Sequence, residues 1–201
     1  DSGSEPVVEK TVSTVEELEA VLNGDETNVV ITVSDDIELS SGIKISGNRE
    51  IVLQGATSDV KITFAESTGV LDANTDHSMF YFEAAANVSM TLQNITLDGA
   101  KKARLFYLGD TKGGTKNKLT LETGATLQNG HPQLAAGETG NQPSGGAVRL
   151  MAGSELVMND GKIINNTANR YGGGIYGWSP DVIVKINGGE ISGNTGNYAG
   201  G

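Results

Sequence analysis

Four aromatic residues near the C-terminus are the side chains best suited to chemistry at a surface. Tyr171 and Tyr198 each precede a Gly-rich block, and Tyr176 and Trp178 lie between them. Exposed aromatic rings offer a large contact area to sugar rings or to a protein partner. We expect this cluster to form a binding surface. The alternative is that the four rings only cover corners of the fold.

No group of residues has the spacing of a known catalytic site. A lyase needs a basic Lys or Arg beside carboxylates, and a glycoside hydrolase needs two acidic side chains at a separation set by its stereochemistry. The Asp35–Asp36 pair, the lone His77 and His131, and the four arginines do not follow either pattern in the sequence. We therefore predict no catalytic residues, and the chain is expected not to be an enzyme.

Repeated Asp and Asn residues have a structural explanation. Asp98 and Asp160, each followed by Gly, resemble the start of calcium-binding repeats but lack their nine-residue spacing, so no metal or other cofactor is predicted. Asn166 and Asn194 hold equivalent positions in an internal repeat. Stacked coils would bring their amides within hydrogen-bond reach, and we expect an asparagine ladder that supports the fold.

These residues belong to a repeat of about 28 residues. Residues 145–148 (Gly-Gly-Ala-Val) recur as residues 173–176 (Gly-Gly-Ile-Tyr), and residues 161–167 recur as residues 189–195. Related positions upstream predict three rows of inward side chains, one residue per coil. The rows are Leu92, Leu121, Met158 and Ile186; Leu97, Leu127, Ile163 and Ile191; and Phe80 or Phe82, Phe106, Val148 or Leu150, and Ile175.

Short apolar runs separated by Gly, Asn, Asp and Ser predict strands at 29–33, 37–39, 43–45, 51–53 and 60–64. Many short strands in a fixed repeat, with few two-residue hairpin signals, favour an all-β parallel β-helix of five to six coils over a sandwich. Gly makes up 28 of the 201 residues, about twice the usual share. We place many of these glycines at the corners between strands, where positive φ angles are needed.

One helix and a tail precede the strands. Two signals predict the helix. The apolar residues Val15, Leu18 and Leu22 lie at i, i+3 and i+7, and a capping box is formed by Ser13 and Glu16 or by Thr14 and Glu17. We expect residues 13–28 to cap the first coil, residues 1–12 to form a flexible tail, and residues 13–201 to form a single domain. A polar insertion at 131–144 is expected to lengthen one coil as a loop.

The charge excludes several classes of partner. The formal net charge is −11, which disfavours nucleic acid and anionic lipid surfaces. The chain has no Cys, which excludes disulfides and thiolate metal sites. No apolar run of about 18 residues is present, so we expect no membrane insertion of this segment.

The repeated blocks resemble a known pattern. The Gly-Gly blocks at 145 and 173, with Ile163-x-x-Asn166 and Ile191-x-x-Asn194, resemble the GGA(I/L/V) and FxxN repeats of bacterial surface β-helix proteins. These include the chlamydial polymorphic membrane proteins and many Gram-positive wall-attached adhesins. The resemblance covers about residues 13–201 and implies a right-handed single-stranded parallel β-helix, a pectin-lyase-like solenoid. The chain has Ile where the FxxN repeat has Phe.

The same resemblance implies an extracellular protein on a bacterial surface or secreted from it. We expect a non-catalytic adhesin segment that binds a host or environmental glycan or a surface protein. The alternative is the front part of a β-helix polysaccharide lyase or glycoside hydrolase whose active site lies in coils beyond residue 201. The last residues, 198–201, look like the opening of another repeat, so we expect further coils and a wall anchor in the parent protein.

Overall fold

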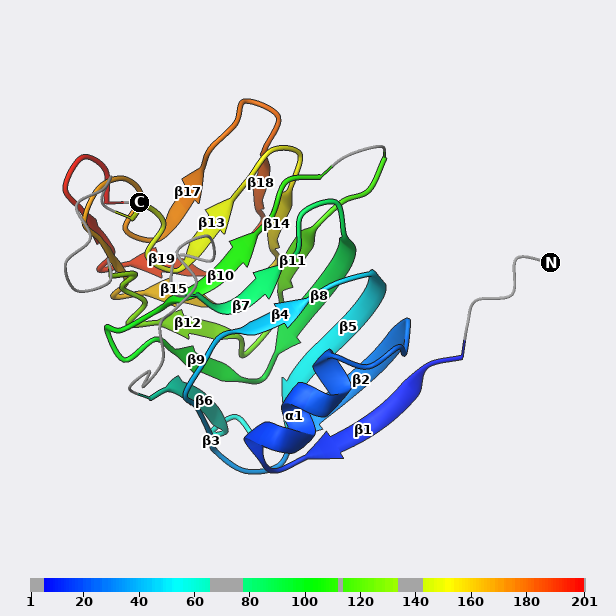
Figure 1. The fold of residues 1–201 in the computed structure, drawn as a ribbon. Coiled ribbons are helices and arrows are strands. Elements are labelled where there is room, and N and C mark those ends of the chain that lie inside the picture. Colours follow the sequence, from blue (N-terminus) through cyan, green and yellow to red (C-terminus); the bar gives the residue numbers. More distant parts are fainter. Residues whose placement is uncertain (1–5, 66–77, 112–113, 134–142, 201) are drawn as a thin grey trace.

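The chain winds into a parallel β-helix, as the repeat predicted (Figure 1). The computed structural model describes residues 6–65, 78–111, 114–133 and 143–200. Every strand pair in these residues is parallel, and strands that are neighbours in a sheet come from successive coils. Five coils contribute a strand to each of three sheets, and a sixth is partial. The predicted five to six coils are therefore confirmed.

Three sheets form the walls of the coil. Sheet A is ordered β1 (Val8–Val12), β2 (Asn28–Val33), β5 (Asn48–Gly55), β8 (Asn87–Gln93), β11 (Lys118–Leu121), β14 (Glu155–Met158) and β18 (Ile183–Ile186). Sheet B is ordered β3 (Ile37–Leu39), β6 (Lys61–Phe64), β9 (Thr96–Asp98), β12 (Thr126–Gln128), β15 (Lys162–Ile164) and β19 (Glu190–Ser192). Sheet C is ordered β4 (Ile43–Ile45), β7 (Ser78–Phe82), β10 (Arg104–Leu108), β13 (Val148–Leu150) and β17 (Ile175–Gly177). A small fourth sheet pairs β16 (Thr167–Ala168) with β20 (Thr195–Gly196).

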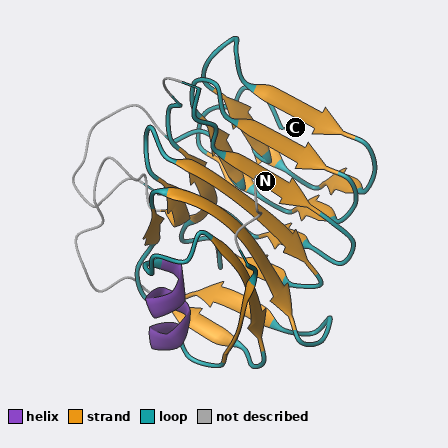
Figure 2. Cartoon of the chain, turned by 90° about the vertical axis from the view of Figure 1, so that its right-hand side faces the viewer, coloured by secondary structure: helices purple, strands orange, loops and turns teal. Residues whose placement is uncertain are grey.

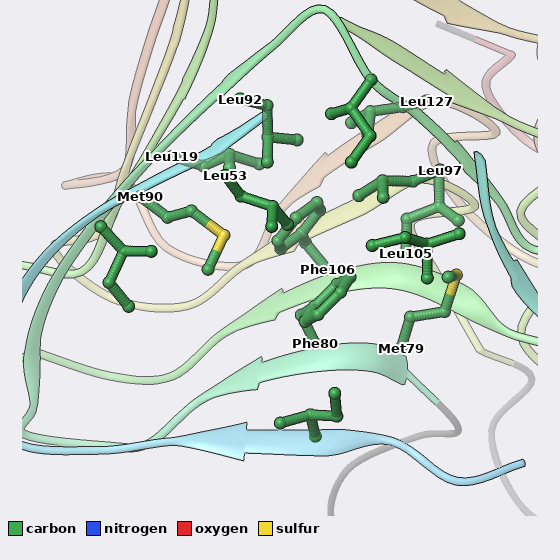
Figure 3. Close-up of a cluster of buried hydrophobic side chains, with 14 of the residues drawn as sticks. Leu53, Met79, Phe80, Met90, Leu92, Leu97, Leu105, Phe106, Leu119 and Leu127 are labelled. Atoms are coloured by element: carbon green, nitrogen blue, oxygen red, sulfur yellow. The ribbon is translucent and has the colours of Figure 1, made fainter. Parts of the chain in front are cut away.

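The interior is filled by the predicted rows of side chains (Figure 3). Leu92, Leu121, Met158 and Ile186 are paired strand to strand, and so are Leu97, Leu127, Ile163 and Ile191. The third row runs through Phe80, Phe106, Val148 and Ile175. The Phe80 and Phe106 rings are stacked, with their centroids 5.3 Å apart. Alternate residues of the strands in the first five coils thus meet in one apolar core, whereas Ile186 and Ile191 in the last coil are exposed.

The coils are less regular than the repeat suggested. Paired residues lie 22 positions apart between Ile31 and Leu53, and 39 apart between Leu53 and Leu92. The next three offsets, along the row from Leu92 to Ile186, are 29, 37 and 28. The coils of 39 and 37 positions contain residues 66–77 and 134–142, which are not described. The predicted loop at 131–144 therefore lies largely outside the described residues.

One predicted alignment is wrong by one residue. Val148 pairs with Ile175, and Arg149 pairs with Tyr176, an offset of 27. Gly145 accordingly corresponds to Gly172, whereas we had matched it to Gly173. Three consecutive glycines at 172–174 leave the Gly-Gly match ambiguous in the sequence. The turn before β18 is one residue longer than the corresponding turn before β14, so Glu155 pairs with Ile183 at an offset of 28.

The helix α1 (Val15–Leu22) lies against the first coil, beside β1, β3 and β4 (Figure 1). Thr14 is its N-cap and accepts a hydrogen bond from the Glu17 N–H, and the Glu17 carboxylate accepts one from the Ser13 N–H. Leu18 and Leu22 are buried in the same core cluster as the strands. The helix therefore covers apolar side chains at one end of the coil, and Figure 2 shows it beside the strands at that end.

Part of the expected tail is a strand. Residues 8–12, which we assigned to a flexible tail, form β1 and pair in register with β2. Val12 is buried and Val8 is partly buried, while Glu9 and Thr11 between them are exposed. This alternation marks an edge strand with one face on the core. A stretch this short and polar carried too little apolar signal for the sequence to separate it from a tail.

A buried arginine joins α1 to the sheets. Arg49 of β5 donates hydrogen bonds to the carbonyl oxygens of Leu22 at 2.6 Å, Val21 at 3.1 Å and Glu26 at 2.7 Å. The last turn of α1 has no basic residue of its own. Arg49 therefore supplies both the donors and the positive charge that the C-terminus of a helix needs.

Candidate functional site

The aromatic residues are sorted by type between the inside and the outside of the coil. All four phenylalanines, Phe64, Phe80, Phe82 and Phe106, are buried in the core. The five tyrosines and the single tryptophan are partly or fully exposed. A tyrosine hydroxyl or an indole N–H needs a polar partner, so these rings are expected at the surface. Chemistry alone does not explain why they gather on one side of the molecule.

The gathering is produced by the register of sheet C. Each of its strands places one side chain outward, between two inward side chains in β4, β7, β10 and β13 and between Ile175 and Gly177 in β17. The register pairs these outward residues coil by coil. In order along the sheet, the outward row is Lys44, Tyr81, Tyr107, Arg149 and Tyr176. A single row running parallel to the axis of the coil therefore carries three rings and two cations.

Four contacts link Tyr81 to Tyr176 along this row, through Tyr107, Arg149 and Trp178. The ring centroids of Tyr81 and Tyr107 are 5.2 Å apart. The Arg149 guanidinium lies 5.6 Å from the centre of the Tyr107 ring and 5.7 Å from that of Trp178. Trp178, which follows β17, contacts Tyr176 edge to face at 6.4 Å. Cation–π and aromatic contacts of this kind hold each side chain in a defined place.

The remaining two tyrosines extend the row along the corner that precedes β17. Tyr171 stacks on Tyr176 with centroids 5.8 Å apart and contacts Tyr198 at 5.1 Å. Arg170 lies over the Tyr171 ring at 4.9 Å. We call the connected set the aromatic stripe, and it comprises Tyr81, Tyr107, Arg149, Arg170, Tyr171, Tyr176, Trp178 and Tyr198.

The structure brings together the four predicted binding residues and adds others. The four rings form a chain of contacts, from Tyr198 to Tyr171, from Tyr171 to Tyr176 and from Tyr176 to Trp178. Their role in binding remains a prediction. Sequence reasoning missed Tyr81, Tyr107 and Arg149, although the predicted Phe80–Phe106 row held the signal. The residue after an inward phenylalanine must point outward in a strand.

Small residues form the corners beside the stripe. The corners that precede β13 and β17 consist of Gly145, Gly146 and Ala147, and of residues 172–174, which are all Gly. These corner residues are buried, and Tyr171, directly before the second corner, stacks on Tyr176. Trp178 is 59% exposed and Tyr198 is 73% exposed. These two rings are the most exposed of the stripe.

The predicted asparagine pair forms hydrogen bonds between coils. The Asn166 side-chain amide donates to Asn194 Oδ1 at 3.0 Å and to the Leu127 carbonyl at 3.1 Å. Its Oδ1 accepts from the Gly130 N–H at 2.8 Å. Asn166 is fully buried, so these bonds satisfy polar groups that have no access to water. The pair ties three coils together at the corner between sheets B and C.

The residue before Gly130, Asn166 and Asn194 turns the chain at the corner in each coil. Asn129, Asn165 and Gly193 occupy equivalent places in three coils and have φ angles of 53°, 57° and 63°. Asn and Gly are the residues that adopt this left-handed conformation at least cost. Their use here is structural, and it explains part of the surplus of Gly and Asn in the repeat.

A second polar surface lies on the outer face of sheet A. A groove of about 690 Å³ is lined by Thr32, Gln54, Gln93 and Glu122, among others. Gln54 donates to Thr32 Oγ1 at 3.0 Å, and Gln93 donates to Gln54 Oε1 at 2.5 Å. The side-chain amides of Gln54 and Gln93 thus already form hydrogen bonds within the sheet. For this reason the groove is a weaker candidate than the aromatic stripe.

The residues considered for catalysis have structural contacts. Asp36 accepts a hydrogen bond from the Lys61 N–H at 2.8 Å, and Asp35 accepts one from the Ser34 hydroxyl at 2.8 Å. His131 Nε2 lies 3.0 Å from Asn169 Oδ1. His77 lies outside the described residues. These contacts stabilise turns and corners.

The Asp-Gly positions are also part of turns. Asp98 accepts hydrogen bonds from the Ala100 N–H and from the side-chain amides of Gln128 and Asn129, at 2.8–3.1 Å. Asp160 accepts from the Thr123 hydroxyl at 3.0 Å. Within the described part of the chain, no three His, Cys, Asp or Glu side chains gather as a metal site would require. Over the same residues, no helix is long and apolar enough to cross a membrane.

Comparison with known proteins gives no relative: no family model, curated protein or solved structure matches the chain. The resemblance to bacterial surface β-helix proteins therefore remains a prediction from the repeat.

Proposed function

We propose that the protein is a non-catalytic binding module that holds a glycan against the aromatic stripe. The observation that supports this most directly is the position of the hydroxylated and indole rings. All five tyrosines and the single tryptophan lie in one connected surface, while all four phenylalanines are inside. A fold that needed these rings only for packing could have placed them on any of its three outer faces.

A glycan suits the stripe better than a protein partner does. Specific protein interfaces bury about 800 Å² on each side and have an apolar centre. The stripe is a row to which β7, β10 and β13 supply one side chain each, and it widens to four side chains in the coil of β17. Its groups are phenols, an indole and guanidinium ions. Rings of this kind contact the apolar faces of sugars, and phenol and guanidinium groups bond to sugar hydroxyls.

The proposed setting is a bacterial cell surface or the surrounding medium, as the resemblance of the repeat implies. In this setting a rigid β-helix would present the stripe to a host or environmental glycan. The alternative proposal, part of a polysaccharide lyase or glycoside hydrolase, differs in one observable. An enzyme would release unsaturated sugars or new reducing ends from the polysaccharide that it binds.

Affinity electrophoresis in gels that contain soluble polysaccharides tests the proposal. We expect at least one polysaccharide to retard the protein without being cleaved. The Tyr176→Ala/Trp178→Ala double variant should bind about tenfold or more weakly, since each aromatic contact contributes about 0.5–1.5 kcal/mol. Gln93→Ala, on the outer face of sheet A, is the matched control and should bind as the parent protein does. Unchanged binding by the folded double variant would refute the proposal.

A further inference from the structure

We infer that the ligand is an uncharged, linear polysaccharide that lies parallel to the axis of the coil and occupies about one sugar unit per coil. This inference rests on the proposed function and adds the direction, the repeat and the charge of the ligand. It follows from the register of sheet C, from the spacing of the rings and from the charges beside them.

The direction follows from how few side chains each strand offers. In β7, β10 and β13 every residue is buried except one, which is Tyr81, Tyr107 and Arg149 respectively. A chain lying along any of these three strands would therefore meet one side chain of the stripe. A chain lying across the strands meets one in each coil, because the three residues are paired in register. Only the second direction uses the whole row.

The repeat follows from the spacing. Neighbouring parallel strands lie about 4.7–4.9 Å apart, which is close to the length of one sugar unit in an extended polysaccharide. The ring centroids of tyrosines on successive coils keep nearly the same interval, with 5.2 Å between Tyr81 and Tyr107 and 5.1 Å between Tyr171 and Tyr198. A linear, unbranched chain can thus place successive sugars against successive coils. Branches on every sugar would prevent this contact.

The charge of the ligand follows from the local and the overall balance. Lys44, at the first position of the row, is paired with Glu83 at 2.6 Å. The guanidinium groups of Arg149 and Arg170 lie over aromatic rings, 5.6 Å from the centre of the Tyr107 ring and 4.9 Å from that of Tyr171, so both positive charges are already in cation–π contact. The chain as a whole carries a formal charge of −11 and repels polyanions. An uncharged polysaccharide avoids this repulsion.

Calorimetric titration with oligosaccharides of two to seven units tests the inference, using the cello-, xylo-, manno- and chito- series. We expect the affinity for one series to rise about two- to tenfold with each added sugar, as each sugar gains a contact with one further side chain of the row, and to level off near five units. Tyr107→Ala interrupts the row in its middle and should remove the gain beyond three units, while Tyr107→Phe retains it. Thermal unfolding of both variants checks that they fold, and Gln93→Ala again serves as the control.

The outcomes separate this inference from the proposed function. If no glycan binds, both fail. If a disaccharide binds as tightly as a hexasaccharide, the binding module stands and the extended, axial ligand is refuted. If polygalacturonate binds more tightly than the neutral series, and raised salt abolishes its binding, the uncharged ligand is refuted. Steady gains with length that persist in 0.5 M salt and disappear in Tyr107→Ala would support the inference.

Discussion

Glu155 shows what one outward side chain contributes to the coil. It lies on the outer face of β14, yet its side chain is only 6% exposed. The Lys116 ammonium lies 2.7 Å from Oε2, and the Lys185 ammonium lies 2.8 Å from Oε1. Hydrogen bonds from these two lysines, opposed by burial, lower the pKa of Glu155 from its ordinary value of 4.5 to about 2. The carboxylate therefore joins three successive coils at neutral pH.

The lowered pKa predicts how stability depends on pH. A carboxyl whose pKa is lower in the folded state stabilises the fold fully above the unfolded-state pKa of about 4.5, and this contribution is lost as the pH falls toward 2. Both lysines are about half exposed, so we expect a contribution on the order of 1–2 kcal/mol. Urea unfolding at pH 7 should show Glu155→Gln destabilised by about this amount, and the difference from the parent protein should shrink between pH 4.5 and pH 2.

An exposed pair provides the control for this experiment. Glu190 and Lys162 are 4.0 Å apart, and both side chains are more than half exposed. Glu190→Gln should leave the free energy of unfolding within about 0.5 kcal/mol at every pH, because exposed pairs contribute little. A difference between the parent protein and Glu155→Gln that stayed constant from pH 7 to pH 2.5 would contradict the role assigned to Glu155.

At the scale of elements, the corner before sheet C limits which residues can stack. Gly146 lies beneath the next coil, where its N–H donates to the Gly172 carbonyl at 3.1 Å. A Cβ atom added at Gly146 would collide with the carbonyl oxygen of Gly173 and would lie 2.7 Å from that of Thr167. Both obstacles are backbone atoms and cannot move without separating the coils. Gly is therefore required here by close approach between coils.

This close approach predicts the effect of a single methyl group. Gly146→Ala should lower the free energy of unfolding by about 2–3 kcal/mol, the range for overpacking in a close-packed interior. Gly177→Ala is the control, since its Cβ would meet the Val182 side chain at 3.3 Å, which a small shift can relieve. Chemical denaturation of both variants measures the difference. Equal stability of the two variants would show that the coils can separate at this corner without cost.

The elements also show how far the sequence could be interpreted. The inward rows through Leu92 and Leu97 were predictable because apolar residues recur at offsets of 28 to 30, apart from the one coil that contains the polar segment at 131–144. A triple glycine that aligns in two ways left the register of Val148 ambiguous, because the third inward row allowed its pairing with Ile175 and the Gly-Gly match paired it with Tyr176. The stripe was missed at Tyr81 and Tyr107 because an outward position has meaning only when the coils are aligned. The pairing between coils decides which outward residues are neighbours, and the local propensities of the residues do not predict this pairing.

At the scale of the whole molecule, each coil touches only its neighbours. Leu92 and Leu121 are fully buried between coils, whereas Val184 and Ile186 of β18 are 43% and 48% exposed. In the described chain β18 pairs with β14 alone in sheet A. The stability of such an array is approximately a sum of coil terms and interface terms, so the coils need not open together. Local opening should therefore cost least at β18 and β19.

Amide hydrogen exchange on the 201-residue chain measures this gradient. We expect amides of β18 and β19 to exchange at least tenfold faster than those of β8 and β11, since the outer strands have a neighbour on one side only. Met158→Ala removes the contact between the last two coils and should speed exchange further in β18 and β19, while β2 and β5, which are several coils away, keep the parent rates. If the substitution raised exchange equally in all sheets, the coils would open as one cooperative unit. The nearest-neighbour description of this molecule would then be wrong.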